Sequence, residues 1–266
     1  MLLKHYYHMY ANGFWETPFK EHLTALINSG LMHNLDFIGV GIVGTEVNRL
    51  RVKEALPPEF FVVAEADSGW EQVTHTQISK DLQTPSKILY AHTKGAANNR
   101  HSQGSWRKEM TDGTVYHWRE CVDLLDQYDV VGCRWRRDPW RHYSGTFWWA
   151  KSSYLSTLAP ISYTYRDDAE AWIGQGSMGG THVEICPSRP NLGVTVHSFG
   201  RTFVSGRTIT GQSSPNQYDN DQFLLGDEFV GFSPIEGNKI ISSLMGQGAL
   251  FSVRGNTIIV TSIREK

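Results

Sequence analysis

The first hundred residues alternate between apolar runs and segments in which apolar side chains recur every three or four positions. Apolar or aromatic runs, which predict strands, occupy residues 2–10, 35–43, 60–64 and 87–91. Segments with helical spacing occupy residues 17–29, 45–55 and 70–82. Thr17 can cap the first of these helices, and Pro18 fits its first turn. This order predicts an α/β fold with a mostly parallel sheet flanked by helices, whose ligand site lies at the carboxyl ends of the strands.

The pattern becomes less regular further along the chain. We expect a mobile polar loop at 96–104 and a helix at 115–127. The expected strands occupy residues 129–135, 145–150, 181–186 and 194–197. The composition of residues 208–217 is that of a linker, and the short apolar runs after it are typical of a β module. The predicted division is a domain at 1–210, then a linker and small β-rich module at 211–266.

Composition restricts the classes of function. The chain has 25 Lys and Arg against 27 Asp and Glu, so no strong overall charge favours a nucleic-acid partner. Its three cysteines have neither C-x-x-C spacing nor an even count, which fits a reducing compartment better than a disulfide scaffold. The sequence contains no signal-peptide pattern and no apolar run of 18 residues, so we expect a cytoplasmic protein without a membrane span.

A short polar segment, H-T-K-G, directly follows the predicted strand at 87–91. It places the imidazole of His92, the hydroxyl of Thr93, the ammonium of Lys94 and the flexible Gly95 where an α/β sheet presents ligand-binding groups. An ammonium can neutralise a pyrophosphate as a point charge. An ordinary turn with incidental polar residues is the alternative.

Five of the nine tryptophans lie between Asp129 and Ile173, among arginines and histidines. Trp148 and Trp149, close to His142 and Ser144, could form a platform with an apolar floor and a polar rim. The competing interpretation is a Trp-rich core strand with charged flanks.

A third group of candidates is acidic and follows the Trp-rich strand. Asp167, Asp168 and Glu170 could supply a general base. The alternative is a charged first turn of a helix, in which the acids only complement the helix dipole.

Familiar catalytic motifs are absent from the sequence. It contains no P-loop, no G-x-G-x-x-G after the first strand, no H-E-x-x-H and no G-x-S-x-G. His5, His8, His33 and His75 lack partners with metal-ligand spacing, so we interpret them as satisfied or exposed side chains.

Taken together, these segments resemble a family of GT-A-like glycosyltransferases found in bacterial polysaccharide clusters and in bacteriophages. The similarity covers roughly residues 2–200 and rests on the strings G-W-E-Q-V-T, I-L-Y-A-H-T-K-G, W-R-x-x-M, D-V-V-G, H-Y-S-G-T-F-W-W-A and A-E-A-W-I. Members of that family usually read H-F-S-G-N-F-W-W, so Thr146 stands where the family has Asn.

The resemblance implies a Rossmann-like transferase that moves a hexose-like sugar from a nucleotide-diphosphate sugar to a hydroxyl of a glycan or protein. The donor-binding residues that it implies are Trp70, Glu71, His92, Thr93, Lys94, Gly95 and Arg107. Those implied for the acceptor or sugar are His142, Ser144, Gly145, Trp148 and Trp149. Glu170, or else Asp168, is the implied base, with Lys94 stabilising the leaving diphosphate.

GT-A enzymes usually hold Mn²⁺ or Mg²⁺ at an Asp-x-Asp, and here His92-Thr93-Lys94 takes that place. Lys94 could replace the metal's charge, or His92 and His197 could act as ligands. The resemblance does not extend to the tail, which is a candidate for oligomerisation. A non-catalytic carbohydrate-binding protein and a phage structural or assembly protein remain alternatives, and neither would bind a nucleotide sugar.

Overall fold

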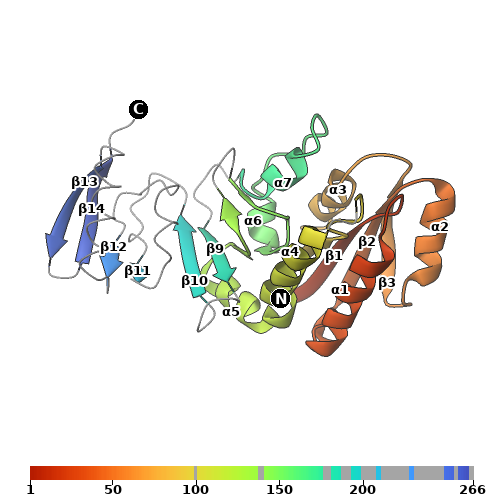
Figure 1. Ribbon diagram of the computed structural model, residues 1–266, viewed down its shortest axis with the longest axis horizontal. Coiled ribbons are helices and arrows are strands. Elements are labelled where there is room, and N and C mark those ends of the chain that lie inside the picture. Colours follow the sequence, from red (N-terminus) through yellow and green to blue (C-terminus); the bar gives the residue numbers. More distant parts are fainter. Residues whose placement is uncertain are drawn as a thin grey trace. The chain divides into compact units, whose positions relative to one another are not determined.

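The computed structural model describes residues 1–98, 101–136, 141–175, 181–186, 193–198, 208–210, 228–230, 249–254 and 257–263. The chain divides into two compact units, Met1–Val194 and Thr195–Lys266. Figure 1 shows the α/β character of the first unit and the short strands of the second.

The main sheet is mixed, mostly parallel and of the Rossmann-like type, with the strand order β10-β9-β5-β8-β4-β1-β2-β3. It belongs to the first unit apart from β10, which continues past the boundary at Val194. Its strands are β1 (Leu2–Tyr10), β2 (Phe37–Val43), β3 (Phe60–Ala66), β4 (Ser86–His92), β5 (Val130–Gly132), β8 (Trp148–Lys151), β9 (Thr181–Cys186) and β10 (Gly193–Ser198). β8 is antiparallel to both of its neighbours, β4 and β5. The predicted mostly parallel α/β sheet is therefore confirmed.

The helices of this unit are α1 (Glu16–Asn28), α2 (Glu46–Ala55), α3 (Gln72–Lys80), α4 (His101–Thr111), α5 (Trp118–Gln127), α6 (Ser152–Leu155) and α7 (Asp168–Trp172). A short 3₁₀ helix, η1 (Met32–Asn34), precedes β2, and a π-helical turn, η2 (Asp112–Tyr116), joins α4 to α5. The first helix begins before Thr17, so that residue is not its cap, although Pro18 does lie in the first turn. The loop expected at 96–104 was wrong in its second part, because α4 begins at His101.

The core lies around the central strands. All seven residues of β4 are buried, and so are six of the nine residues of β1. Helix α3 packs against β1, β2 and β3, while α5 packs against β5 and β8. Strands covered on both faces read as nearly continuous apolar runs, which is why the sequence identified them.

Between β1 and β4 the chain changes its direction of travel across the sheet. From β1 it moves outward through β2 to β3, and it then returns to form β4 on the other side of β1. β1 and β4 are parallel, with His8 opposite His92 near their carboxyl ends. In open α/β sheets the crevice at such a switch point is the usual place for a ligand.

In the second unit the described strands form a sheet of their own, with the order β11-β12-β14-β13. The strands are β11 (Thr208–Thr210), β12 (Glu228–Val230), β13 (Ala249–Arg254) and β14 (Thr257–Ile263). The linker expected from residue 208 was wrong at its start, because β11 is a strand that pairs with β12. The rest of that linker lies outside the described residues. The division at 210 and the role of the tail in oligomerisation stay predictions.

No helix in the described ranges is long and apolar enough to cross a membrane.

Candidate functional site

A pocket lies at the carboxyl ends of β1 and β4, at the switch point of the sheet. Its volume is about 360 Å³. The lining residues are His8, Tyr10, Gly69, Trp70, Glu71, His92, Thr93, Lys94, Gly95, Ala96, Ala97, Asn98, Gln103 and Arg166. The structure thus brings together six of the seven predicted donor-binding residues, the exception being Arg107.

The H-T-K-G segment is tied to the end of β1 by hydrogen bonds. Thr93 N donates to the carbonyl oxygen of His8 over 2.9 Å, and Thr93 Oγ1 accepts from Tyr10 N over 3.0 Å. Gly95 has φ of +87°, and a Cβ at this position would lie 2.8 Å from Gln103 Cβ. Because a side chain would be both strained and crowded there, only glycine suits this turn.

Two side chains in contact, His92 and Glu71, form one wall of the pocket. His92 Nε2 lies 2.9 Å from the carbonyl oxygen of Gly145, which can only accept, so Nε2 carries a hydrogen. His92 Nδ1 lies 3.2 Å from Glu71 Oε1, so a hydrogen bond between these two atoms requires one more proton. Tyr90 also donates to Glu71, from its hydroxyl to Oε2 over 3.2 Å.

Burial shifts both groups of this pair towards their uncharged forms. Burial and the nearby charge of Lys94 lower the pKa of His92 to about 3. Burial also raises the pKa of Glu71, against the opposing effect of the nearby cationic groups. Glu71 is the only carboxyl group among the residues lining the pocket.

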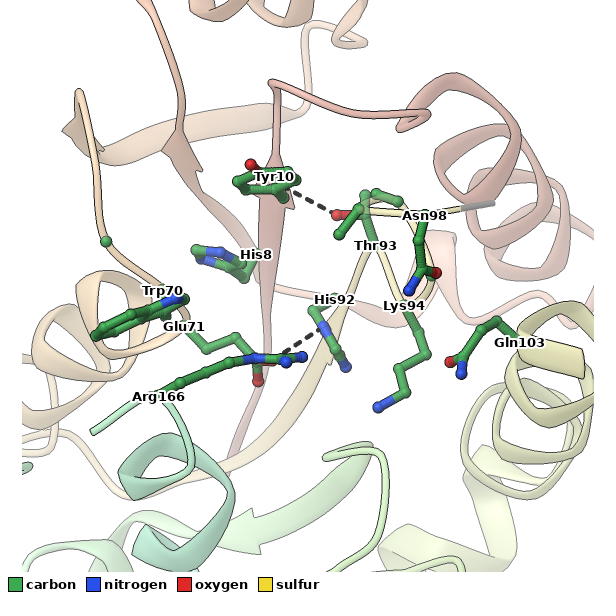
Figure 2. A pocket seen from close by; sticks show the side chains of 14 residues that line it. His8, Tyr10, Trp70, Glu71, His92, Thr93, Lys94, Asn98, Gln103 and Arg166 are labelled. Atoms are coloured by element: carbon green, nitrogen blue, oxygen red, sulfur yellow. Dashed lines mark hydrogen bonds and ion pairs between the residues drawn. The ribbon is translucent and has the colours of Figure 1, made fainter. Parts of the chain in front are cut away.

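Two cationic side chains, Lys94 and Arg166, reach into the same pocket. Figure 2 shows Arg166 and Glu71 extending towards His92 from one side, and Lys94 and Gln103 lying on the other. Neither Lys94 nor Arg166 forms an ion pair with any residue that the structure describes. Trp70, whose exposed fraction is 43%, lies at the edge of the pocket.

Arg107, the seventh predicted donor-binding residue, stabilises the H-T-K-G segment without lining the pocket. Its Nη1 donates to the carbonyl oxygen of Lys94, and its Nε donates to Glu21 Oε2, each over 2.7 Å. The side chain is buried and does not line the pocket. Direct contact with a donor is therefore not its role here.

The predicted acceptor platform is not a surface. Trp148 and Trp149 have an exposed fraction of 0%, and Trp149 Nε1 donates to the carbonyl oxygen of Thr114 over 2.8 Å. His142 is buried in β7 (His142–Tyr143), which pairs with β6 (Trp135–Arg136). The tryptophans are core residues of β8, so the interpretation as a Trp-rich core strand holds and a sugar could not stack on them.

Ser144 and Gly145 form the turn before β8. Ser144 is half-buried, and its N–H donates to the carbonyl oxygen of Arg134 over 3.0 Å. Gly145 has φ of +96°, and Thr146 follows with φ of +61°, an uncommon value for a β-branched residue. The sequence indicated neither the tightness of this turn nor its contact with His92.

Both predicted bases, Glu170 and Asp168, accept hydrogen bonds from backbone N–H groups. Glu170 Oε1 accepts from Gly145 N over 2.7 Å, and Glu170 is not among the residues lining the pocket. Asp168 Oδ2 accepts from Tyr165 N over 2.9 Å, at the start of α7. Hydrogen bonds from Ser162 and from the backbone of Tyr165 lower the pKa of Asp168. Their placement corrects the expectation that either carboxylate faces the ligand.

The side chains of the pocket are not suitable ligands for a divalent metal ion. Within the described ranges no three His, Cys, Asp or Glu side chains come together in a way that could hold an ion. Both ring nitrogens of His92 are already engaged, and the side chain of His197 lies outside the described residues. The pocket combines one carboxyl group with two cationic groups, which is the opposite of the oxygen-rich site that Mg²⁺ or Mn²⁺ prefers.

Among the polar residues of the pocket, sequence reasoning missed five: His8, Tyr10, Asn98, Gln103 and Arg166. His8 and Tyr10 are two apart on β1, so they share one face of the strand, a spacing that could have been noticed. Their proximity to His92 depends on the pairing of β1 with β4, and strand pairing cannot be predicted from a single sequence.

Comparisons with known proteins add little about activity. No curated protein matches the sequence. Among solved structures, one match is the crystal structure of 4-diphosphocytidyl-2C-methyl-D-erythritol synthase. The match covers 57% of this chain and 77% of that chain, with 11% sequence identity and a TM-score of 0.34. That similarity is too low to support a functional argument.

A family model matches residues 34–195, which include β2 to β9 and all pocket residues except His8 and Tyr10. The matched region is more than half of the chain. The protein therefore belongs to the family described as a domain of unknown function, DUF8361.

Proposed function

We propose that this protein is a GT-A-like transferase that uses a nucleotide-diphosphate sugar, and that the pocket between β1 and β4 binds the donor. The observation that carries the proposal is the presence of Lys94 and Arg166, both without ion-pair partners among the described residues, in a pocket at the switch point of the sheet. Paired cationic groups of this kind fit the charge of a diphosphate. The resemblance of H-T-K-G and its flanking segments to glycosyltransferases supports the same assignment.

The remaining lining residues fit the other parts of such a donor. Trp70 presents a half-exposed aromatic face on which a nucleobase could stack. Asn98 and Gln103 bring amide groups that can hydrogen-bond sugar hydroxyls.

In this proposal, charge stabilisation is the work of the two cationic side chains. The bond between the sugar's anomeric carbon and the diphosphate oxygen breaks, and its electron pair stays on the diphosphate. Lys94 and Arg166 then stabilise the charge on the leaving group, a form of catalysis that needs no metal. This agrees with the poor fit of the pocket to a metal ion.

The proton of the acceptor hydroxyl also needs a destination. Glu71 is the carboxyl group that lines the pocket, and we assign it the role of base that was expected of Glu170 or Asp168. A raised pKa suits a carboxylate that must accept a proton near neutral pH. The acceptor oxygen forms its bond to the anomeric carbon while its proton passes to Glu71.

The rival functions are less well supported. The carbohydrate-binding alternative depended on Trp148 and Trp149, which are buried. A structural or assembly protein has no need of unpaired cationic groups in a pocket. Both rivals predict no binding of a nucleotide sugar.

A thermal-shift screen tests the proposal. We expect at least one uridine, guanosine or thymidine diphosphate sugar to stabilise the protein, because a ligand at 100 times its dissociation constant adds about 2.7 kcal/mol. The matching nucleosides, which lack phosphates, should stabilise it much less. Absence of any shift with all these donors at millimolar concentration would contradict the proposal.

A further inference from the structure

One face of α4 is directed at the H-T-K-G segment. Gln103, Trp106 and Arg107 are three and four residues apart, so they lie on the same side of the helix. Gln103 lines the pocket and packs beside Gly95. The ammonium of Lys94 lies 4.4 Å from the centre of the Trp106 ring, which is a cation–π contact.

Lys94 is therefore held at two points by neighbouring residues of α4. Arg107 binds its carbonyl oxygen, and Glu21 of α1 holds Arg107 in turn. Trp106 holds the other end of the side chain. A free lysine side chain has many rotamers and loses this freedom when it binds an anion, so a lysine that is already oriented binds with a smaller entropic cost.

Packing fixes the position of Trp106 itself. Its indole N–H is buried and has no hydrogen-bond partner among the described residues. A Cβ built on Gly145 would lie 3.2 Å from Trp106 Nε1, so the ring lies against the turn that accepts a hydrogen bond from His92. The guanidinium of Arg134 also lies 5.0 Å from the ring centre and is paired with Glu109.

We propose that Trp106 is a positioning residue of the anion site: it orients the Lys94 ammonium and so sets the affinity for a diphosphate without touching the ligand. The inference rests on the proposed function, because it assumes that Lys94 binds the anion. It predicts that removing the aromatic face weakens phosphate binding even when the fold and the lysine are intact.

Calorimetric titration with inorganic pyrophosphate tests this directly. Trp106→Leu should weaken binding by roughly 3- to 10-fold, while Trp106→Phe, which keeps an aromatic face, should lose less than the Leu variant. Trp118→Leu is the matched control, because Trp118 lies under the guanidinium of Arg119 at 4.3 Å but does not line the pocket. The control should bind pyrophosphate as the wild type does.

Nuclear magnetic resonance provides a readout that needs no ligand. The ε-methylene protons of Lys94 should be shifted upfield by the Trp106 ring in the wild type, and this shift should disappear in Trp106→Leu. An unshifted Lys94 in the wild type, or equal pyrophosphate affinity for the wild type and Trp106→Leu, would overturn the inference alone. Failure of the wild type to bind pyrophosphate would instead overturn the proposed anion site, and this inference with it.

Discussion

The H-T-K-G segment at the end of β4 and the turn before β8 are joined by a hydrogen bond from His92 to Gly145, yet they differ in what they present to solvent. The first opens into the pocket and offers Lys94 and Thr93 to a ligand. The second leads into Trp148 and Trp149, which are fully buried. The first segment therefore has the chemistry of a binding site. The second is part of the core and holds the first in place through the hydrogen bond to His92.

This contrast shows how to weigh aromatic and charged residues. Large rings occur in cores as often as in sites, and burying them is favourable without any ligand. An ammonium that lines a pocket gains nothing from leaving water unless it is paired, and Lys94 has no ion-pair partner among the described residues. The cationic group is the better sign of function in this chain.

The largest expected effect comes from removing a ring of the buried segment. Trp149→Ala should lower the free energy of unfolding by about 3–5 kcal/mol, since it leaves a cavity and removes the hydrogen bond to Thr114. Trp70→Ala, at the half-exposed edge of the pocket, should cost less than about 1 kcal/mol. Urea denaturation of both variants measures the difference, and equal losses would remove the contrast between core and site.

A change at the wall of the pocket should affect turnover and leave the fold intact. Glu71→Gln keeps the size of the side chain and its contact with His92 Nδ1, but an amide cannot accept the proton that a carboxylate base accepts. We expect donor hydrolysis to fall roughly 10²- to 10⁴-fold with little change in donor affinity. Glu59→Gln, at an exposed position, is the control. Near-normal turnover in the Glu71 variant would return the role of base to Glu170 or to another group.

The buried histidines of β1 should contribute to the pH dependence of stability, whereas exposed histidines should not. Burial lowers the pKa of His5 to about 4, and the same cause lowers that of His8 to about 4. The unfolded chain binds protons at these positions below about pH 6.5 and the folded chain does not, so stability should fall as the pH drops from 6.5 towards 4. Each such group contributes about 1.4 kcal/mol per pH unit.

Urea denaturation at pH 7, 6 and 5 measures this slope. His5→Gln should make it shallower, whereas His33→Gln, at an exposed position, should leave it unchanged. An unaltered slope in the His5 variant would mean that other groups control acid stability.

The smallest effect concerns the turn between the two regions. Thr146 has φ of +61°, which asparagine tolerates better than a β-branched residue, so Thr146→Asn should raise stability by about 0.5–1 kcal/mol. Thr24→Asn, in the right-handed α1, should not be stabilising. A loss of stability in the Thr146 variant would mean that the packing of its methyl group outweighs the backbone preference.

Much of the fold could be predicted because its strands and helices have clear periods. The apolar runs that became β1 to β4 fixed the parallel half of the sheet, and H-T-K-G could be placed at a strand end. The burial of Trp148 and Trp149 could not be predicted, because it depends on β8 inserting between β4 and β5. Arg166 and Glu71 meet only in three dimensions, since they come from the segments before α7 and α3.

The most direct test of the account is the affinity of a nucleoside diphosphate for Lys94→Ala, compared with Lys80→Ala. Lys94 lines the pocket, whereas Lys80 lies exposed at the end of α3. Calorimetric titration with uridine and guanosine diphosphates should give binding to the wild type and to Lys80→Ala, and binding weakened at least 10-fold for Lys94→Ala. Equal affinities of the two variants, or no binding to the wild type, would contradict the claim that this pocket is the donor site.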